Sequence, residues 1–387
     1  MNNRKRLLIK NAKVYMEDET LESGHIYIED NIIRDINENC DSKEGVPILD
    51  ANGASVIPGF IDGHIHGANG ADVMDATEEA LDKMAKVLPQ EGTTSFLATT
   101  MTQSKENISR ALVNVAEYQN KPGQAEVLGI HLEGPFINKE KKGAQPAEYV
   151  LHPALELFDE WQKLSGNSIK TVTLAPELDH DGKLIRHLYE RGINVSAGHT
   201  CATYSEMVKA VDYGVRQVTH LCNAMTGLHH RDIGVTGAAF LLQPIRSELI
   251  ADGHHVVPEM LELIYKNIGS DRLLLITDSM RAKCMPSGMY DLGGQQVTTE
   301  YGKATLEDGT LAGSILKLID AAKLMFEINS VSIRDIIKMT SENPAKQIGV
   351  FKRKGSIAKG KDADLLIVDD DLQIMYTICR GEISFQG

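Results

Sequence analysis

VIPGFIDGHIH, residues 56–66, is an apolar run that is punctuated by a Pro-Gly pair and ends in two histidines. Its apolar part, residues 56–61, is typical of a buried β-strand. In extended chain the imidazoles of His64 and His66 point to the same side, so both can reach one cation. Two unrelated histidines would give the same spacing, but Gly59 and Gly63 relieve crowding of the backbone and favour a site. The stretch therefore predicts a strand that carries a pair of metal ligands.

The chain after this strand alternates strands with helices. Further strands are expected at residues 93–99, 127–132, 169–174, 194–197, 217–219, 247–250 and 272–277. One helix is expected from Thr77 to Gly92, and another begins at a capping box, Thr203 with Glu206. Eight strands that alternate with helices predict a (β/α)8 TIM barrel. A doubly wound open sheet has the same alternation, but no glycine-rich phosphate loop follows the first strand.

The two ends of the chain differ from this middle part. Short β-like segments occur at residues 7–9, 13–15, 25–29 and 31–33, and again at residues 363–368, 374–378 and 382–385. A glycine-rich insertion at residues 281–313 is expected to form a β-hairpin before a helix at residues 314–326. Because the termini of a domain often lie close together, both ends are expected to build one small β-sandwich domain. The predicted fold class is α/β, with a barrel of residues 58–349 and a β-sandwich of residues 1–57 plus 350–387.

Composition limits the possible partners. The 387 residues carry a formal net charge of −14, which argues against nucleic acid or an anionic membrane as a partner. No run approaches the roughly 18 apolar residues that a membrane span needs. The five cysteines (Cys40, Cys201, Cys222, Cys284 and Cys379) include no CxxC spacing, so reduced thiols and a cytoplasmic location are expected.

Metal-ligand side chains fall at the ends of the expected strands. They are His64 and His66, Glu133, His199, His220 and Asp278. In a barrel these positions share the carboxyl-terminal face, where active sites are built. A lone histidine or glutamate at a strand end is usually structural, but so many on one face predict a metal centre. Zinc, iron, manganese and cobalt all accept nitrogen and oxygen ligands of this kind.

A metal centre of this kind indicates a hydrolytic function. A bound metal lowers the pKa of water to about 7, and a pair of metals can also polarise a carbonyl group. A carboxylate beside that water can act as a base and later as an acid to the leaving amine. Asp278, after the apolar residues 273–276, suits that role; it can also be a ligand, or both.

The motifs resemble those of the amidohydrolase superfamily. The two histidines after the first strand, the strand-end histidines, Asp278 and the closing segment of residues 343–365 carry this resemblance. More narrowly, the chain resembles the N-acetylglucosamine-6-phosphate deacetylase family in the motifs HLEGPF (131–136), SAGHT (196–200), THLCNAM (219–225), ADGHHV (251–256) and LAGS (311–314). These motifs extend over nearly the whole chain.

The resemblance implies a reaction and a metal centre. The reaction is deacetylation of N-acetyl-D-glucosamine 6-phosphate to D-glucosamine 6-phosphate and acetate, a step of amino-sugar catabolism. Glu133, His199 and His220 match the metal site that the family shares, and His64 and His66 match a second site. Two divalent ions per subunit, zinc or iron, are therefore expected, with Glu133 bridging them. Asp278 matches the catalytic aspartate.

The resemblance also implies substrate contacts. Asn223, Ala224 and Arg231 match phosphate contacts, and Arg231 is expected to reach the site of a neighbouring subunit in a homodimer. Arg231 lies in a basic cluster, GLHHR, and arginine suits bidentate phosphate binding. His255 matches a sugar contact. Gln145 stands where relatives place a histidine that polarises the acetyl carbonyl.

Other functions remain open at this point. An N-acetylgalactosamine-6-phosphate deacetylase has the same motifs, and a cyclic amidase or an aminoacylase has a similar plan. HLEGPF and the segment at His254-His255 do not suit the cyclic amidases. A non-catalytic assembly barrel is disfavoured, because such relatives have typically lost metal ligands and this chain keeps all six.

Overall fold

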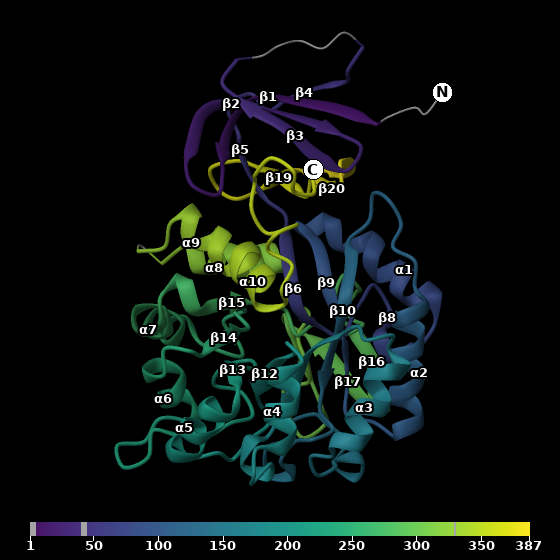
Figure 1. The fold of residues 1–387 in the computed structure, drawn as a ribbon, viewed down its shortest axis with the longest axis vertical. Coiled ribbons are helices and arrows are strands. Elements are labelled where there is room, and N and C mark those ends of the chain that lie inside the picture. The colour runs from purple at the N-terminus through teal and green to yellow at the C-terminus, as the bar shows by residue number, and fades with distance from the viewer. Residues whose placement is uncertain (1–4, 40–44, 329) are drawn as a thin grey trace.

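A computed structural model describes residues 5–39, 45–328 and 330–387. Figure 1 shows a barrel of strands and helices with a sheet above it, and the sheet contains both the purple start and the yellow end of the chain. Cys40 lies outside the described residues. Within the described ranges, no helix combines the length and the hydropathy that crossing a membrane requires.

The barrel contains eight parallel strands in sequence order. They are β6 (Phe60–Ile65), β9 (Thr93–Thr100), β10 (Glu126–Glu133), β11 (Ile169–Leu174), β12 (Asn194–Ala197), β13 (Val215–Val218), β14 (Arg246–Leu249) and β15 (Leu273–Leu275). The barrel closes where Asp278 N donates to His64 O at 2.8 Å and His66 N donates to Ser279 O at 2.9 Å. The predicted fold class is confirmed.

The prediction of one continuous strand over residues 56–61 is wrong, because this segment belongs to two strands. β5 (Ser55–Pro58) pairs with β1 and β19 of the upper sheet, and β6 begins two residues later and pairs with β9. Pro58 has no N–H to continue a ladder. A Cβ on Gly59 would lie 2.3 Å from Thr94 Oγ1, so only glycine lets the chain pass this close to β9. The apolar run is therefore shared between two sheets.

Helices form the outer ring of the barrel (Figure 1). They are α1 (Glu78–Val87), α2 (Lys105–Glu117), α3 (Leu155–Leu164), α4 (Lys183–Glu190), α5 (Tyr204–Tyr213), α6 (Gly234–Leu241), α7 (Pro258–Ile268) and α8 (Leu318–Phe326), followed by α9 (Ile333–Ile337) and α10 (Asn343–Gln347). The capping box of Thr203 and Glu206 is present at the start of α5. The helix expected at residues 314–326 begins only at Leu318, because Ser314 is bonded to the barrel through Asp278 O and Thr277 O.

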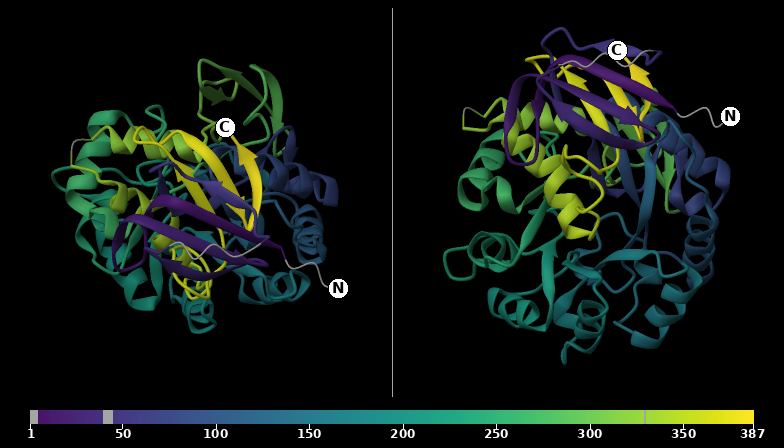
Figure 2. Two further views of the ribbon diagram at one scale, coloured as in Figure 1. Left: turned by 90° about the horizontal axis from the view of Figure 1, so that it is seen from above. Right: turned by 45° about the horizontal axis from the view of Figure 1, so that its top comes forward.

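The upper sheet joins both ends of the chain. Its strands are β1 (Arg6–Tyr15), β2 (Thr20–Glu29), β3 (Ile32–Asn37), β4 (Ile48–Asp50), β5, β19 (Leu365–Val368), β20 (Ile374–Cys379) and β21 (Glu382–Gln386). Purple and yellow strands lie side by side in Figure 2. β5 joins the two ends of the chain, because it pairs with β1 on one side and with β19 on the other. Ile9, Ile26, Leu365 and Ile378 share one buried core. The domain boundaries at residues 57/58 and 349/350 stay a prediction.

Smaller sheets lie at the carboxyl-terminal face of the barrel. The insertion expected as a hairpin contains three antiparallel strands, β16 (Gly288–Leu292), β17 (Gln295–Glu300) and β18 (Lys303–Thr305). β7 (Gly67–Ala68) pairs with β8 (Ala71–Asp72) directly after His64 and His66. Both sheets follow strands that carry candidate ligands.

A buried ion cluster connects the barrel with the upper sheet. Lys354 is only 1% exposed, and its Nζ lies 2.8 Å from Glu126 Oε2 and 3.3 Å from Asp362 Oδ2. It also pairs with Asp364. Burial lowers the pKa of Lys354, but the surrounding carboxylates outweigh burial and raise it. The ammonium therefore neutralises carboxylates from β10 and from the segment before β19.

We predict that Lys354→Ala destabilises the protein by about 3–5 kcal/mol, because removal of one partner leaves buried carboxylates without a counter-charge. Thermal and denaturant unfolding measure the change. Lys352→Ala is the matched control, since Lys352 is exposed on the same turn and should change stability by no more than about 0.5 kcal/mol. Equal stability of the two variants would contradict the prediction.

Candidate active site

The candidate ligands lie at the carboxyl-terminal ends of the barrel strands. His64 is inside β6, and Glu133 is the last residue of β10. His199, His220 and Asp278 follow β12, β13 and β15, and their φ angles are 49°, 32° and 48°. Left-handed backbone at residues other than glycine is strained and clusters at functional sites. The surrounding barrel therefore holds these three side chains in conformations that an isolated chain disfavours.

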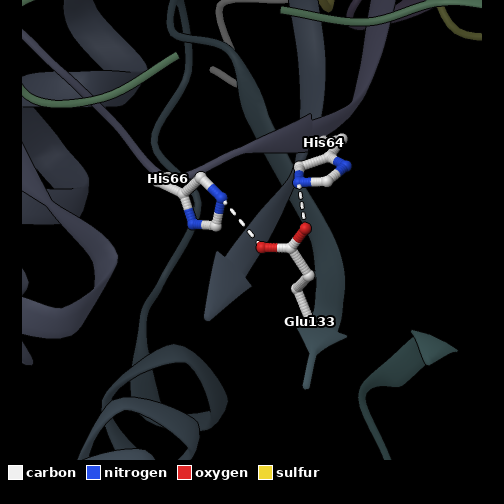
Figure 3. Close-up of side chains that lie close together, drawn as sticks. All are labelled: His64, His66 and Glu133. Atoms are coloured by element: carbon white, nitrogen blue, oxygen red, sulfur yellow. Dashed lines mark ion pairs between the residues drawn. The ribbon is translucent and has the colours of Figure 1, made fainter. Parts of the chain in front are cut away.

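Glu133 lies between His64 in β6 and His66, the residue after β6, as Figure 3 shows. His66 Nε2 is 3.2 Å from Glu133 Oε2, and His64 Nε2 is 3.4 Å from Glu133 Oε1. Asp278 Oδ1 lies 3.2 Å from His66 Nε2 and 3.4 Å from His64 Nε2. All of these side chains are buried or nearly so. Two imidazoles and two carboxylates thus converge on one point.

A second group shares Glu133. Oε1 of Glu133 lies 3.1 Å from His199 Nε2 and 3.2 Å from His220 Nε2. The two ring nitrogens are themselves 3.1 Å apart. Lone pairs that face each other at this distance repel unless a proton or a cation lies between them. This arrangement has the donor chemistry of a metal site.

These residues fit a divalent cation. His64, His66 and Glu133 form one ligand group, and Glu133, His199 and His220 form another. All four imidazoles present Nε2 to the carboxylate of Glu133, and His64 Nε2 is buried without a hydrogen-bond partner among the described residues. Nitrogen and carboxylate oxygen are the ligands that zinc, iron and related ions accept.

The carboxylates and histidines shift one another's protonation. Burial lowers the pKa of His66, but hydrogen bonds and charge from Asp278 and Glu133 outweigh burial and raise it to about 10. Burial raises the pKa of Asp278, but the positive charge of His64 and His66 outweighs burial and brings it to about 2. In the metal-free site the carboxylates are therefore ionised and His66 carries a proton that a cation must displace.

Other buried groups orient the ligands. His199 Nδ1 donates to Lys141 O at 2.9 Å. Gln145 donates from Nε2 to Glu133 Oε2 at 2.7 Å and accepts at Oε1 from Thr102 N at 2.7 Å. Both ends of the Gln145 amide are thus hydrogen-bonded, and the nitrogen end holds Glu133.

Glu248 was missed by the sequence analysis. Its Oε2 lies 2.9 Å from His64 Nδ1, and both side chains are buried. The sequence does contain a signal for it, namely a carboxylate inside a short barrel strand. Ionised side chains are rarely buried without a partner, so a glutamate at such a position indicates a buried partner nearby. His64 and Glu248 also lie near His131, whose ring nitrogens already contact Gly63 O and Thr173 Oγ1.

A cavity of about 340 Å³ opens above the ligands. It is lined by predicted site residues His66, Glu133, Gln145, His199, His220, Asn223, Ala224, His255 and Asp278, together with Met101, Leu292 and Leu311. His64 lies beneath it, fully buried. Phosphate-contact candidates and ligand candidates therefore share one cavity.

Arg231 is placed elsewhere. It is exposed and lines a separate hollow with Thr203, Tyr204 and Ser205 at the start of α5. Its Nη1 lies 2.5 Å from His230 Nε2. Within one chain the structure does not bring Arg231 into the cavity that contains the other candidate residues. The roles assigned to all of these side chains stay predictions.

Comparison with known proteins gives consistent matches. Residues 55–384 match the model of the amidohydrolase family. The N-acetylglucosamine-6-phosphate deacetylase of Bacillus subtilis is 48% identical, over 98% of this chain and 97% of that protein. The N-acetylgalactosamine-6-phosphate deacetylase of Escherichia coli O157:H7 is 34% identical, over 97% of this chain and 99% of that protein. The crystal structure of N-acetylglucosamine-6-phosphate deacetylase from Pasteurella multocida has a TM-score of 0.92 at 30% identity, covering 99% of this chain and 100% of that one.

We predict that binding of a divalent cation to chelator-treated protein releases protons. Because the pKa of His66 is about 10, the cation displaces its proton at neutral pH, and the apparent affinity rises as pH increases towards that value. Zinc titration with a pH-indicator dye in weak buffer measures the release. His66→Asn should release fewer protons, whereas His187→Asn, on α4, should match the unaltered protein. An affinity that does not change with pH would contradict the prediction.

Proposed function

The chain belongs to the amidohydrolase family, and within it to the N-acetylglucosamine-6-phosphate deacetylases, and we propose that it hydrolyses N-acetyl-D-glucosamine 6-phosphate to D-glucosamine 6-phosphate and acetate. The observation that carries the proposal is the position of Glu133 between two pairs of histidines, with Asp278 beside one pair. The relative that is 48% identical over nearly the full length is named an N-acetylglucosamine-6-phosphate deacetylase. This favours the gluco substrate over the galacto epimer. Such a reaction belongs to amino-sugar catabolism, in the cytoplasm.

The metal centre is proposed to hold two divalent ions per subunit. Glu133, His199 and His220 would hold one, and His64, His66 and Glu133 the other, with zinc or iron favoured and manganese or cobalt also accepted by these ligands. A cation bound there lowers the pKa of water to about 7 and polarises the acetamide carbonyl. Gln145 keeps the shared carboxylate of Glu133 in place through its 2.7 Å hydrogen bond.

Asp278 is proposed to move the proton. Its pKa of about 2 keeps the carboxylate ionised at neutral pH, so it can accept a proton from the attacking water. The same carboxyl group then donates that proton to the amine as the C–N bond breaks. Its place beside His66, in the wall of the cavity, puts it within reach of a bound acetamide.

The phosphate is proposed to bind at Asn223 and Ala224, which line the same cavity. His255, which also lines the cavity, contacts the sugar; its Nδ1 is held by Asp252 Oδ2 at 2.7 Å. Arg231 is exposed and outside this cavity. Following the family resemblance, we propose that it serves the phosphate of a neighbouring subunit and that the functional unit is a homodimer.

The function is tested by acetate release from N-acetylglucosamine 6-phosphate, from the unphosphorylated sugar and from the galacto epimer, with and without chelator. We expect fast, chelator-sensitive release from the phosphorylated gluco substrate alone. Faster acetate release from the galacto epimer would identify that epimer as the substrate instead. No release by protein that contains metal would overturn it.

Asp278→Asn is expected to lower kcat by about 100- to 10,000-fold, because general acid–base catalysis contributes on this order. Circular dichroism and the unfolding temperature should stay unchanged. Asp271→Asn is the control, since Asp271 is exposed two residues before β15 and its ion pair, with Lys338, lies away from the cavity. Turnover near that of the unaltered protein in Asp278→Asn would refute the assignment.

Subunit mixing tests the role of Arg231. Arg231→Ala and Asp278→Asn should each be nearly inactive alone. Co-expressed, they should recover part of the activity, because a mixed dimer contains one site with an intact Asp278 and an intact Arg231 from its partner. A chain that carries both substitutions, co-expressed with unaltered chain, is the control. Absence of recovery in dimers shown to be mixed would place Arg231 in its own subunit's site or outside catalysis.

A further inference from the structure

Glu248 contacts both histidine groups of the metal centre from beneath. Its side chain is 2% exposed in β14. Oε2 lies 2.9 Å from His64 Nδ1 and accepts from His220 N at 3.3 Å. Its backbone oxygen accepts from Leu221 N at 2.8 Å. One residue that is not a ligand thus touches the ring of one ligand and the backbone of another.

The other oxygen of Glu248 ends a line of buried polar side chains. Gln217 Nε2 donates to Glu248 Oε1 at 2.6 Å, and Asn194 Nδ2 donates to Gln217 Oε1 at 3.0 Å. Gln347 Nε2 donates to Asn194 Oδ1, and Arg246 Nη1 donates to Gln347 Oε1 at 2.7 Å. We refer to these four side chains, Arg246, Gln347, Asn194 and Gln217, as the polar relay.

The direction of every bond in the polar relay is fixed. Arginine has only donors, so the amide oxygen of Gln347 must face Arg246 and its nitrogen must face Asn194. The same alternation passes through Asn194 to Gln217, whose nitrogen must then face Glu248. An ionised carboxylate has only acceptors, so Glu248 accepts the bond that Gln217 donates. The bond direction set by Arg246 at one end is therefore the direction that Glu248 requires at the other. None of the three amides can turn over without placing two donors or two acceptors together.

We propose that Glu248 is a positioning residue, which with the polar relay keeps the proton of His64 on Nδ1 and leaves Nε2 free for a cation. Glu248 accepts at both oxygens, so His64 Nδ1 must donate to it. Nε2, which lies 3.4 Å from Glu133 and from Asp278, is then the nitrogen that gives up its proton to a cation. The bond from His220 N to the same carboxylate fixes the second histidine group relative to the first. The inference rests on the proposed function, because it concerns a ligand of that centre.

Glu248→Gln tests the proposal without a change of shape. The new NH2 group faces either Gln217 Nε2, where two donors meet at 2.6 Å, or His64 Nδ1, where the second donor, His220 N, is more distant at 3.3 Å. Because the relay prevents Gln217 from turning, the amide group should donate to Nδ1 and move the imidazole proton to Nε2. We expect affinity for zinc, measured by chelator competition, to fall by about 10- to 100-fold, the usual range for such partners. Nitrogen-15 spectra of labelled histidine should show the proton on Nε2.

A second substitution should reverse the effect. In Gln217→Glu combined with Glu248→Gln, the amide group of residue 248 can donate to the new carboxylate, and its oxygen can again accept from His64 Nδ1. Asn194 Nδ2 keeps its acceptor. Zinc affinity and the Nδ1 proton should therefore return towards those of the unaltered protein. The double variant has the same total charge as the unaltered protein. The position of the imidazole proton, and not zinc affinity alone, therefore separates rescue of the hydrogen-bond direction from rescue of net charge.

Glu126→Gln is the matched control, because Glu126 is another carboxylate of a barrel strand, paired with Lys354 at the far end. It should lower stability and leave zinc affinity unchanged. Unchanged zinc affinity in Glu248→Gln, or equal affinity of the single and double variants, would overturn the proposal. Failure of the unaltered protein to bind zinc or any related ion would instead count against the proposed function, so the two failures are distinguishable.

Discussion

The closure of the barrel between β6 and the chain after β15 is the constraint on which the site depends. Asp62 is fully buried, accepts from His64 N at 3.2 Å and binds the hydroxyl of Thr277 at 2.5 Å. Burial raises the pKa of Asp62, and the charge of Lys283 and the bonds from Thr277 oppose that rise. Because these bonds join the first and last strands, His64 and Asp278 become neighbours although they are far apart in the chain. Without closure, His64 and His66 would lie at one edge of an open sheet and Asp278 at the other.

The site concentrates charge and strain that the rest of the barrel must hold. Three candidate ligands have left-handed backbone, and each such residue costs about 1–3 kcal/mol. Glu133 and Asp278 lie within a few ångströms of each other in a buried region, where like charges repel strongly unless cations or protons lie between them. Fixed hydrogen bonds to Gln145, Lys141 O and Glu248 stop these groups from relaxing apart. Repulsion between the fixed carboxylates therefore destabilises the site, and a bound cation would relieve that repulsion.

Sequence reasoning succeeded where one residue type and its position in an element carry the information. The strand ends at Glu133 and His199, and the capping box at Thr203, were read correctly because they depend on neighbours in the chain. It failed where a distant segment decides the outcome. Residues 56–61 divide between two sheets because β19 pairs with the first part of this segment and β9 with the second. The helix expected from Ser314 starts later because Ser314 is bonded to the barrel. None of these partners lies within the local pattern.

The sequence by itself determined the eight alternating strands, the nitrogen and oxygen ligand set, and the family, since periodicity and motifs are properties of consecutive residues. Tertiary structure alone decided three things. It placed Glu133 between both histidine pairs, it left Arg231 outside the cavity of its own chain, and it aligned Arg246, Gln347, Asn194, Gln217 and Glu248 behind His64. The physical reason is that hydrogen bonds and Coulomb interactions act over a few ångströms in space, and only the closed barrel brings residues from β6, β10, β12, β13 and β14 within that range.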